Sequence, residues 1–471
     1  MLVNDTDAAY PVRIDPTFSD ANWISMGGVQ GADISVSAAV VDGSGNLYVG
    51  GRFTVVGDVI ANRIAKWNGT SWSALGSGMN SNVSALGMSG SDVCAGGGFT
   101  TAGGSAANYI ARWTGSSWSA LGSGMNNRVS ALAASGSDVY AAGWFTTAGG
   151  GAANFIAKWN GATWTALGSG MNSNVYALAV LGSDVYAGGQ FTTADGGVAN
   201  YVAKWDGSSW SALGSGMNYY VYALAVSGSD VYAGGGFTTA GGSAANYIAK
   251  WNGSSWSALG SGMNSKVYAL AVSGGDLYVG GGFMTAGGSA ANYIAKWDGV
   301  TWTALGSGMN NYVYAVAVWG SDLYAGGYFT TADGSAANYV AKWDGSSWSA
   351  LGSGMSGGSF LSVYALAVSG SDLYAGGAFT TAGGKVSAYT ARAYLLPLPT
   401  VSVRRSSIPL GGITVSWPSA DTADFSLQQA GTLTAPASWV SNTATITDDG
   451  TKKSVTLPAT NPAQFFRLRR P

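Results

Sequence analysis

Histidine and glutamate are missing from this sequence, and all 23 of its acidic residues are aspartates. Nucleophilic triads of the usual kind need a histidine base, and zinc sites need histidines or several cysteines. Catalysis by paired carboxylates needs two acidic side chains about 5–10 Å apart, and the repeats described below carry one aspartate each in their first turn. The sequence therefore predicts no catalytic residues, no metal ligands and no cofactor.

Cysteine, charge and long apolar runs are also scarce. The single cysteine, Cys94, excludes a disulfide within the chain, and it stands where most repeats have tyrosine, which indicates a small buried residue. Charged residues make up 9% of the sequence and the net charge is −2, so the basic stripe typical of a nucleic-acid-binding protein is missing. No run of about 18 apolar residues predicts a membrane span.

Glycine and aromatic residues are abundant, with 74 Gly, 19 Trp and 24 Tyr. Disordered segments are poor in aromatics, so this composition is typical of short strands joined by tight turns. A Lys-Trp or Arg-Trp pair recurs every 46 residues, ending at Trp67, Trp113, Trp159, Trp205, Trp251, Trp297 and Trp343. A fixed period of this length indicates a repeat architecture.

Each repeat carries four strand signals, which the unit beginning at Val221 illustrates. The segments VYALAV, DVYAGGGFTT, NYIAKW and SWSALG are predicted strands, separated by Ser-Gly-Ser, by AGGSAA and by an Asn-Gly or Asp-Gly turn. Four short antiparallel strands in about 45 residues make one propeller blade. No stretch has helical periodicity, so we expect an all-β fold.

The number of strands indicates how the ring closes. First strands begin near Ser35 and then at Val83, Val129, Val175, Val221, Val267, Val313 and Val363, which makes eight. The last unit lacks a fourth strand, and residues 22–27 align with the missing one. We therefore predict an eight-bladed β-propeller of 46-residue repeats in which the N-terminal strand closes the last blade.

Four parts follow from these boundaries. We predict an N-terminal lead-in at residues 1–21, the propeller at 22–394, a Pro-rich linker at 395–400 and a small β-sandwich at 401–471. The sandwich rests on segments that alternate with period two, at 413–417, 425–428, 454–457 and 464–468.

The blade motifs resemble a known family. GGxFT, N-Y-I-A-K-W and SSWSALGSGM are similar to the extracellular propeller repeats of the fungal cortical cell-polarity marker and of related bacterial secreted proteins. Residues 13–18, Arg-Ile-Asp-Pro-Thr-Phe, resemble the delta-60 propeller repeat. The resemblance covers about residues 12–395. It implies a propeller in a secreted or cell-surface setting, and it supplies no catalytic residues.

The repeated charged residues are expected to pair. One aspartate lies in the first turn of seven repeats, and a Lys or Arg such as Lys66, Arg112 or Lys158 ends the third strand on the same side of the blade. We predict a structural ion pair repeated around the ring. Asp195 and Asp333 replace glycine in two loops between the second and third strands, which leaves calcium binding open as an alternative.

Differences between the copies indicate a candidate binding face. One variable position precedes the Phe of GGxF, and it is occupied by Arg52, Gly98, Trp144, Gln190, Gly236, Gly282, Tyr328 and Ala378. The other is the loop from the fourth strand to the next blade, with Ser81-Asn82, Asn127-Arg128, Ser173-Asn174, Tyr219-Tyr220, Ser265-Lys266, Asn311-Tyr312 and residues 356–362. In propeller topology both sets belong to one face. We predict that Arg52, Trp144, Gln190, Tyr219, Tyr220, Tyr312 and Tyr328 bind a ligand there.

The leading hypothesis is a non-catalytic recognition module, secreted or on the cell surface, that binds glycan or protein. A signal peptide is not visible and is expected to have been removed. The alternative is a structural or adhesive spacer without a specific ligand. The near-identical blades predict a monomer that refolds slowly, with strand-swapped oligomers as by-products.

Overall fold

The computed structural model describes residues 19–24, 26, 31–358, 361–395, 401–406, 412–419, 426–430, 440–458 and 465–469. They form two compact units, one of Ser19–Tyr394 and one that contains the described residues from Leu395 onward. The predicted lead-in before residue 19, including its delta-60-like segment, lies outside the described residues, as do residues 396–400 of the predicted linker and residues 359–360 of the extended loop.

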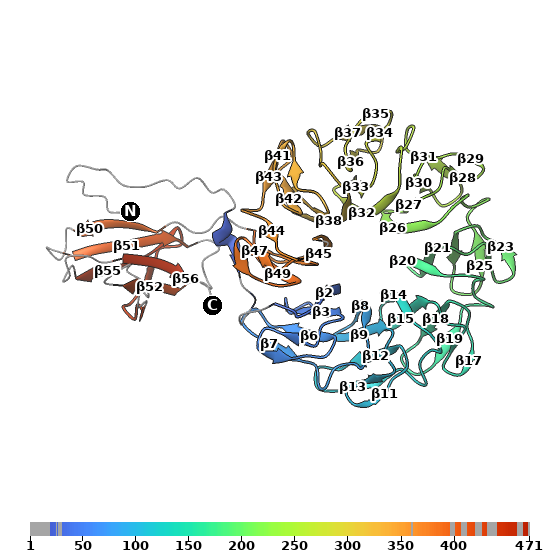
Figure 1. The fold of residues 1–471 in the computed structure, drawn as a ribbon, viewed down its shortest axis with the longest axis horizontal. Coiled ribbons are helices and arrows are strands. Elements are labelled where there is room, and N and C mark those ends of the chain that lie inside the picture. Colours follow the sequence, from blue (N-terminus) through green and yellow to red (C-terminus); the bar gives the residue numbers. More distant parts are fainter. Residues whose placement is uncertain are drawn as a thin grey trace. The chain divides into compact units, whose positions relative to one another are not determined.

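The unit Ser19–Tyr394 contains eight four-stranded antiparallel sheets, which surround a centre as the blades of a propeller (Figure 1). Blades 1 to 8 are numbered in the chain order of their first strands, which are given next. The first, innermost strands are β2 (Val36–Val41), β8 (Val83–Ser89), β14 (Val129–Ser135), β20 (Val175–Leu181), β26 (Val221–Ser227), β32 (Val267–Ser273), β38 (Val313–Trp319) and β45 (Val363–Ser369). The second strands are β3 (Leu47–Gly51), β9 (Asp92–Gly97), β15 (Asp138–Gly143), β21 (Asp184–Gly189), β27 (Asp230–Gly235), β33 (Asp276–Gly281), β39 (Asp322–Gly327) and β46 (Asp372–Gly377).

The outer two strands of each blade carry the paired tryptophans. The third strands are β6 (Ile64–Trp67), β12 (Ile110–Trp113), β18 (Ile156–Trp159), β24 (Val202–Trp205), β30 (Ile248–Trp251), β36 (Ile294–Trp297), β42 (Val340–Trp343) and β49 (Thr390–Tyr394). The fourth strands are β7 (Trp72–Ala74), β13 (Trp118–Ala120), β19 (Trp164–Ala166), β25 (Trp210–Ala212), β31 (Trp256–Ala258), β37 (Trp302–Ala304), β43 (Trp348–Ala350) and β1 (Trp23–Ile24). This strand-rich repeat propeller is the fold class that the sequence predicts.

The last blade takes its fourth strand from the N-terminal part of the chain. A 3-10 turn, η1 (Asp20–Asn22), leads into β1, and β1 pairs antiparallel with β49, with Trp23 opposite Ala393. Consecutive first strands contact one another around the full circle, from β2 through β45 and back to β2. Strand pairing at this one blade therefore joins the two ends of the propeller chain.

A ring of indole hydrogen bonds joins each blade to the one before it. Trp118 Nε1 in blade 2, for example, donates to the backbone oxygen of Leu75 in blade 1 at 2.7 Å. The same bond recurs at every junction: Trp72 to Met26, Trp164 to Leu121, Trp210 to Leu167, Trp256 to Leu213, Trp302 to Leu259, Trp348 to Leu305 and Trp23 to Leu351. The fourth-strand tryptophan is conspicuous in the repeat because it is a connector between blades.

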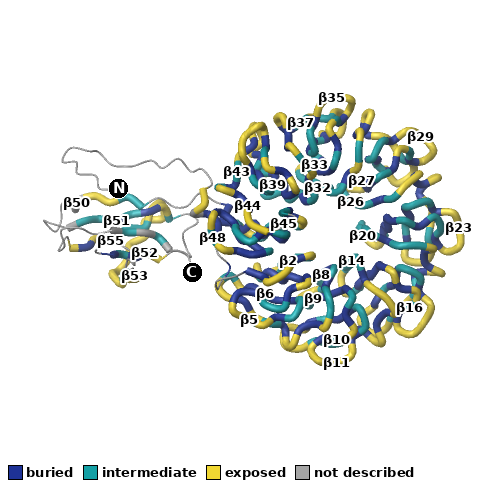
Figure 2. The backbone as a smooth tube through the Cα atoms, in the orientation of Figure 1, coloured by how far each residue is buried: buried dark blue, intermediate teal, exposed yellow. Residues whose placement is uncertain are grey.

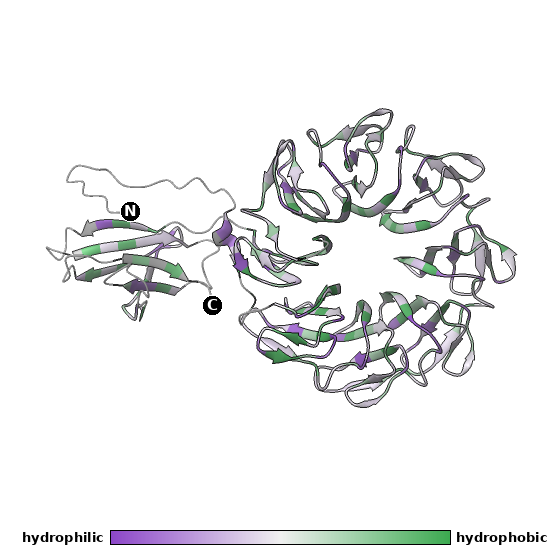
Figure 3. Cartoon of the chain, in the orientation of Figure 1, coloured by the Kyte–Doolittle hydropathy of each residue, from purple (hydrophilic) through white to green (hydrophobic). Residues whose placement is uncertain are grey.

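Small residues on the second strands let the blades pack closely. A Cβ atom on Gly188 would lie only 2.6 Å from Cγ1 of Val221 in the next blade, a distance that real side chains do not reach. Hydrophobic residues line these inner strands (Figure 3). Cys94 is buried in one such layer, as predicted, and burial raises the pKa of its thiol to about 12.

The second strand ends earlier than the sequence predicts. In blade 5 the predicted strand through Thr239 stops at Gly235, and a separate hairpin follows, because Gly241 and Gly242 both adopt positive φ and close a two-residue turn. These hairpins lie at the outer edge of the ring, and their turns and second strands are mostly exposed while the alanine or valine that ends each first strand is buried (Figure 2). They are β4–β5 (Val55–Val56, Val59–Ile60), β10–β11 (Thr101–Ala102, Ser105–Ala106), β16–β17 (Thr147–Ala148, Gly151–Ala152), β22–β23 (Thr193–Ala194, Gly197–Val198), β28–β29 (Thr239–Ala240, Ser243–Ala244), β34–β35 (Thr285–Ala286, Ser289–Ala290), β40–β41 (Thr331–Ala332, Ser335–Ala336) and β47–β48 (Thr381–Ala382, Lys385–Val386), the last joined by β44 (Met355–Ser356).

The described part of the second unit forms two sheets. One has the order β50 (Ser402–Ser406), β51 (Gly412–Pro418), β55 (Lys452–Pro458) and β54 (Thr447–Asp448), and the other has the order β53 (Val440–Ser441), β52 (Ser426–Ala430) and β56 (Phe465–Arg469). A small core contains Val415, Trp417, Leu427, Val455 and Leu457. Phe425 and Gln464, at the starts of two predicted strands, lie outside the described residues. In the part of the chain that the structure describes, no helix is long and apolar enough to cross a membrane.

Candidate functional site

The two variable sets of residues lie side by side at one face of the propeller. The backbone N–H of Trp144, just after a second strand, donates to the carbonyl of Arg128, just before the first strand of the same blade, at 2.9 Å. The equivalent bond joins Tyr328 to Tyr312 at 2.9 Å. We call this the loop face, and it comprises Arg52, Gly98, Trp144, Gln190, Gly236, Gly282, Tyr328 and Ala378 together with Ser35, Asn82, Arg128, Asn174, Tyr220, Lys266, Tyr312 and Ser362.

Most of the predicted binding residues are accessible on this face. The exposed fractions of Trp144, Tyr219, Tyr312 and Tyr328 are 44%, 43%, 41% and 44%. Arg52 is exposed as well, whereas Gln190 and Tyr220 are half-buried. Arg128 lies over the indole of Trp144, with its guanidinium carbon 5.2 Å from the ring centroid, so one aromatic face is covered by a cation.

A row of five tyrosines, which the sequence analysis did not single out, runs along the first strands of blades 4 to 8. Each first strand has a register shift after its opening valine, and in blade 5 this shift falls between Val221 and Ala223, at Tyr222. The residues at this position are Tyr176, Tyr222, Tyr268, Tyr314 and Tyr364, which we call the tyrosine arc. Their ring centroids are 6.3, 6.2, 5.8 and 6.0 Å apart in sequence order.

Blades 1 to 3 carry serine at the same position, as Ser37, Ser84 and Ser130. The loop face is therefore divided into a tyrosine side and a serine side. This division is visible in the sequence as a change from Val-Ser-Ala to Val-Tyr-Ala after the third repeat. It was overlooked because the position belongs to a predicted strand, where we expected packing residues.

The predicted tyrosines and Gln190 extend the arc outward. The hydroxyl of Tyr176 donates to Gln190 Oε1 at 2.8 Å, and Gln190 Nε2 donates to the hydroxyl of Tyr220 at 2.7 Å. Tyr219 stacks on Tyr220 with centroids 4.1 Å apart. Gln190 and Tyr220 thus hold neighbouring rings in place, and their polar groups are already hydrogen-bonded.

Tyr312 fills the corresponding place farther along the arc. Its ring centroid lies 6.3 Å from that of Tyr268 and 6.1 Å from that of Tyr314. A Cβ atom on Gly282 would come 3.1 Å from Cε1 of Tyr312. The glycine at this variable position therefore leaves room for the tyrosine of the next loop, so the variable positions compensate one another in volume.

The phenol groups of the arc are hydrogen-bond donors at neutral pH. Burial raises the pKa of Tyr176, Tyr222, Tyr268 and Tyr314, and neighbouring tyrosines add to this effect for all four. A closely spaced, half-exposed row of neutral rings offers apolar surface with a hydroxyl at each edge. Such a surface suits stacking against sugar rings or contact with a protein loop.

The opposite face is built from ion pairs. Seven blades pair the first-turn aspartate with the cation that ends the third strand, as Arg112–Asp92, Lys158–Asp138, Lys204–Asp184, Lys250–Asp230, Lys296–Asp276, Lys342–Asp322 and Arg392–Asp372. This repeated pairing confirms the prediction. In blade 1 the aspartate is replaced by Asn46, and Lys66 instead lies 5.5 Å from the ring centroid of Tyr48.

The two loop aspartates that left calcium open have backbone partners. Asp195 Oδ1 accepts from the N–H of Ser169 at 2.7 Å, and Asp333 Oδ1 accepts from the N–H of Ser307 at 2.8 Å. Within the described residues no three or more His, Cys, Asp or Glu side chains gather as a metal site would require. These bonds account for both aspartates as loop-forming residues.

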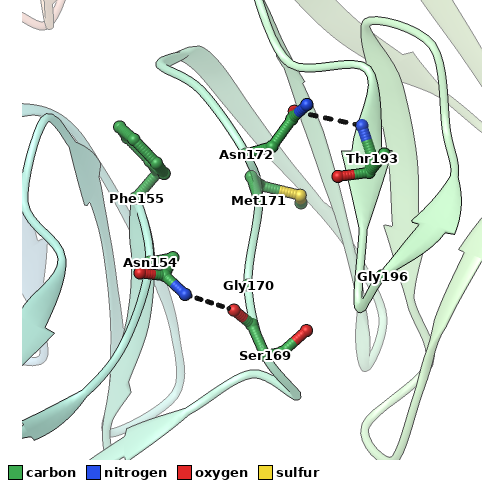
Figure 4. A pocket seen from close by; sticks show the side chains of 8 residues that line it. All are labelled: Asn154, Phe155, Ser169, Gly170, Met171, Asn172, Thr193 and Gly196. Carbon is green, nitrogen blue, oxygen red and sulfur yellow. Dashed lines mark hydrogen bonds between the residues drawn. The ribbon is translucent and has the colours of Figure 1, made fainter.

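A hollow of about 390 Å³ lies between blades 3 and 4, lined by Asn154, Phe155, Ser169, Gly170, Met171, Asn172, Thr193 and Gly196 (Figure 4). Asn154 Nδ2 donates to the backbone oxygen of Ser169 at 2.8 Å, and Asn172 Oδ1 accepts from the N–H of Thr193 at 3.1 Å. The two amides therefore hold the segment that connects these blades, Asn154 from the side of blade 3 and Asn172 from the segment itself to blade 4.

Comparison with known proteins identifies the class as a repeat β-propeller. A family model described as the Rax2 C-terminal beta propeller domain matches residues 19–183, less than half of the chain. The crystal structure of the computationally designed Ika8 protein is similar to this chain with 18% identity and a TM-score of 0.51, covering 79% of this chain and 99% of that one. The family match agrees with the resemblance that the blade motifs carry, and the Ika8 likeness concerns the fold alone.

Two more distant structures also have partial likeness. They are the GH74 xyloglucanase from Xanthomonas campestris (12% identity, TM-score 0.40, covering 84% of this chain and 59% of that chain) and the β-propeller domain of the Trilobed protease from Pyrococcus furiosus (11% identity, TM-score 0.39, covering 67% and 97%). A comparison with curated proteins finds no match. The propeller fold itself supports a protein-binding or structural module.

Proposed function

We propose that this protein is a non-catalytic recognition module that binds glycan or protein through its loop face. The observation that carries the proposal is the tyrosine arc with the exposed rings beside it. Random substitution at an exposed position without a ligand would give side chains of different chemistry in different blades. Five consecutive blades instead carry a tyrosine at this half-exposed position. Tyr, Trp and Arg are the residues that dominate binding energy at recognition surfaces, and Ser, Gly and Asn commonly surround them.

The accounting of carboxylates supports a non-catalytic role. Seven aspartates of the propeller form the repeated ion pairs on the opposite face. Asp206, Asp298 and Asp344 accept backbone N–H bonds in the turns between third and fourth strands. Both sets lie in turns of the face opposite the loop face. A secreted or cell-surface setting is part of the proposal and rests on the resemblance of the blade motifs to secreted propeller repeats.

The test compares the native protein with a variant in which three tyrosines of the arc are replaced by the residue that other blades carry at the same position. Tyr222→Ser, Tyr268→Ser and Tyr314→Ser together place in blades 5 to 7 the serine that blades 1 to 3 already carry. The control is Val300→Ser, which changes an exposed residue in a turn of the opposite face. All three proteins are screened on glycan and protein arrays, with circular dichroism to check the fold.

We expect the triple variant to lose binding and the Val300 variant to keep it. Ligands bound equally by all three proteins would show that the arc is not the binding surface. An absence of binding by the native protein on both arrays would favour the second candidate, a structural spacer. The observation that favours a spacer is the hollow of Figure 4, because its amides are hydrogen-bonded within the protein and so serve its structure.

A further inference from the structure

Blade 1 carries arginine at two positions where no other blade does, one on the loop face and one at the start of the third-strand motif. Arg52 stands where the other blades have Gly, Trp, Gln, Tyr or Ala. Arg63 stands at the start of the third-strand motif, where every other blade has an aromatic: Tyr109, Phe155, Tyr201, Tyr247, Tyr293, Tyr339 and Tyr389. The two differences are independent in sequence, yet they fall in one blade.

The backbone at Arg63 follows the same path as in the other blades. Its φ is 66°, close to the 65° of Tyr201, and its N–H donates to the carbonyl of Phe53 at 2.7 Å, as that of Tyr201 does to Phe191. The left-handed conformation is therefore a property of the repeat. Because six other blades place tyrosine at this position in the same conformation, the fold does not require arginine there.

The two arginines line one hollow. Arg52 and Arg63, together with Ser81 and Asn82 from the loop that enters blade 2, line an open hollow of about 280 Å³. Among the described residues, neither guanidinium is within 4 Å of a carboxylate, whereas seven other cations of the propeller are in ion pairs. Asp33, in the loop entering blade 1, accepts from Thr54 Oγ1 at 2.5 Å and from the N–H of Val55 at 3.2 Å.

Two unpaired guanidinium groups beside one hollow favour an anionic occupant, because each offers a planar fork of donors that matches a carboxylate. The other lining groups are a hydroxyl and an amide, and Asn82 Nδ2 donates to the hydroxyl of Ser84 at 2.9 Å. Of the residues that the structure describes, only these four polar ones line the hollow. The hollow therefore has no apolar surface on which an apolar anchor residue of a protein partner could pack. Its hydroxyl and amide groups can instead bond to the hydroxyls of a sugar.

We infer that this hollow is a subsite for the carboxylate of an acidic sugar, a uronate residue of a glycan bound on the loop face. The inference rests on the proposed function and names the chemical class of its ligand. Blade 8, where the tyrosine arc ends at the 46% exposed Tyr364, adjoins blade 1. A glycan held by its carboxylate at the arginines therefore has aromatic surface available in a neighbouring blade.

The experiment replaces each arginine with a residue that other blades carry at the same position. Arg52→Gly copies blades 2, 5 and 6, and Arg63→Tyr copies six blades, so the double variant is expected to fold. The control, Lys66→Gln, removes a cation from the same blade but from the opposite face, where Lys66 lies against the ring of Tyr48. Isothermal titration uses tetragalacturonate and tetramannuronate, the methyl ester of each, and hexaglutamate.

We expect the native protein to bind at least one of the two uronates and to bind its methyl ester and hexaglutamate at least ~10-fold more weakly. The double variant should lose ~10-fold or more in uronate affinity, the effect of removing hydrogen bonds to a charged group. The Lys66 variant should stay within about 2-fold of native, and added salt should weaken native binding more than binding by the double variant.

Three results would overturn the inference. They are binding of neither uronate, equal binding of a uronate and its methyl ester, and arginine-dependent binding of hexaglutamate in preference to the sugars, which would assign the hollow to an acidic peptide. If one of these results is obtained while the double variant retains the array ligands of the native protein, the uronate subsite fails and the recognition function stands. Loss of array binding in the tyrosine variant is a separate readout, so the two proposals can fail independently.

Discussion

Arg392 holds the junction at which the ring closes, and its ion pair differs from the others in burial. Its Nη2 donates to Asp372 Oδ2 at 2.8 Å, and its Nη1 donates to the carbonyl of Gly69, in a turn of blade 1, at 2.8 Å. The side chains of Arg392 and Asp372 are 4% and 12% exposed, whereas those of Lys250 and Asp230 are 32% and 26% exposed. The same pairing motif thus occurs in one protein in a buried and in a solvated form.

The two forms should respond differently to loss of the carboxylate charge. Asp372→Asn leaves a buried guanidinium without its counter-ion, which typically destabilises a protein by about 3–5 kcal/mol. Asp230→Asn breaks a solvated pair, for which about 0.2–1 kcal/mol is typical. Because asparagine has nearly the volume of aspartate, neither change creates a cavity, so the difference between the two variants reports the effect of burial.

The measurement is urea unfolding of both variants and the native protein, followed by tryptophan fluorescence and circular dichroism. We expect the Asp372 variant to lose several times more free energy of unfolding than the Asp230 variant. A third variant, Arg392→Lys, separates the bond to Gly69 from the charge, since lysine cannot reproduce the two-pronged contact. Equal losses for Asp372→Asn and Asp230→Asn, within about 0.5 kcal/mol, would refute the reasoning from burial.

Two further predictions concern the closing strand and the dependence of stability on pH. Trp23→Ala removes a fully buried indole and its bond to Leu351, and should lower the free energy of unfolding by about 3–5 kcal/mol. Trp256→Ala, at the half-buried equivalent position, should lower the free energy of unfolding less. The opposite order would contradict the closure role of β1. Stability should be nearly constant from about pH 5 to 9, because the chain has no histidine. It should fall at alkaline pH, since the bond that Lys250 donates to Asp230 raises the pKa of Lys250. This contribution is complete below the unfolded value of 10.5 and is lost as pH rises through the raised pKa. It should fall again in acid, since backbone N–H groups of Ser347 and Ser346 lower the pKa of Asp344 to about 2, a contribution that is present above 3.8 and lost as pH falls through about 2. Urea midpoints measured across this range test both limbs, and a step near pH 6–7 would count against the assignment.

The repeat made the blades predictable because strand, turn and pairing signals recur with one period. The aspartate and cation of each blade could be paired because a turn and the end of the adjacent strand lie at the same edge of the sheet. What the period could not reveal is how two strands pair in detail. The register shift that leaves Tyr222 unpaired and the separate hairpin after Gly235 depend on hydrogen bonds between two segments. The sequence pattern describes each segment alone, so it does not contain this information.

The candidate site was predictable in part for a related reason. Trp144 and Tyr328 could be placed on one face because propeller topology alternates the faces of successive loops. That Gln190 bonds to Tyr176 and Tyr220 could not be foreseen, because it depends on the reach of side chains from two blades. Arg63 escaped notice because the motif around it is otherwise that of a third strand, and the tyrosines it replaces had no expected role on the surface.

The indole bonds between blades run in one direction around the circle and return to where they began. In contacts, no blade is first or last, and only the backbone distinguishes the place where β1 enters. A gene rearranged to open the chain in another blade, with the original ends of the propeller linked, would encode the same circle of blades with the same loop-face residues in the same cyclic order. The place at which the propeller chain is opened can thus change without changing the surface that the ring presents.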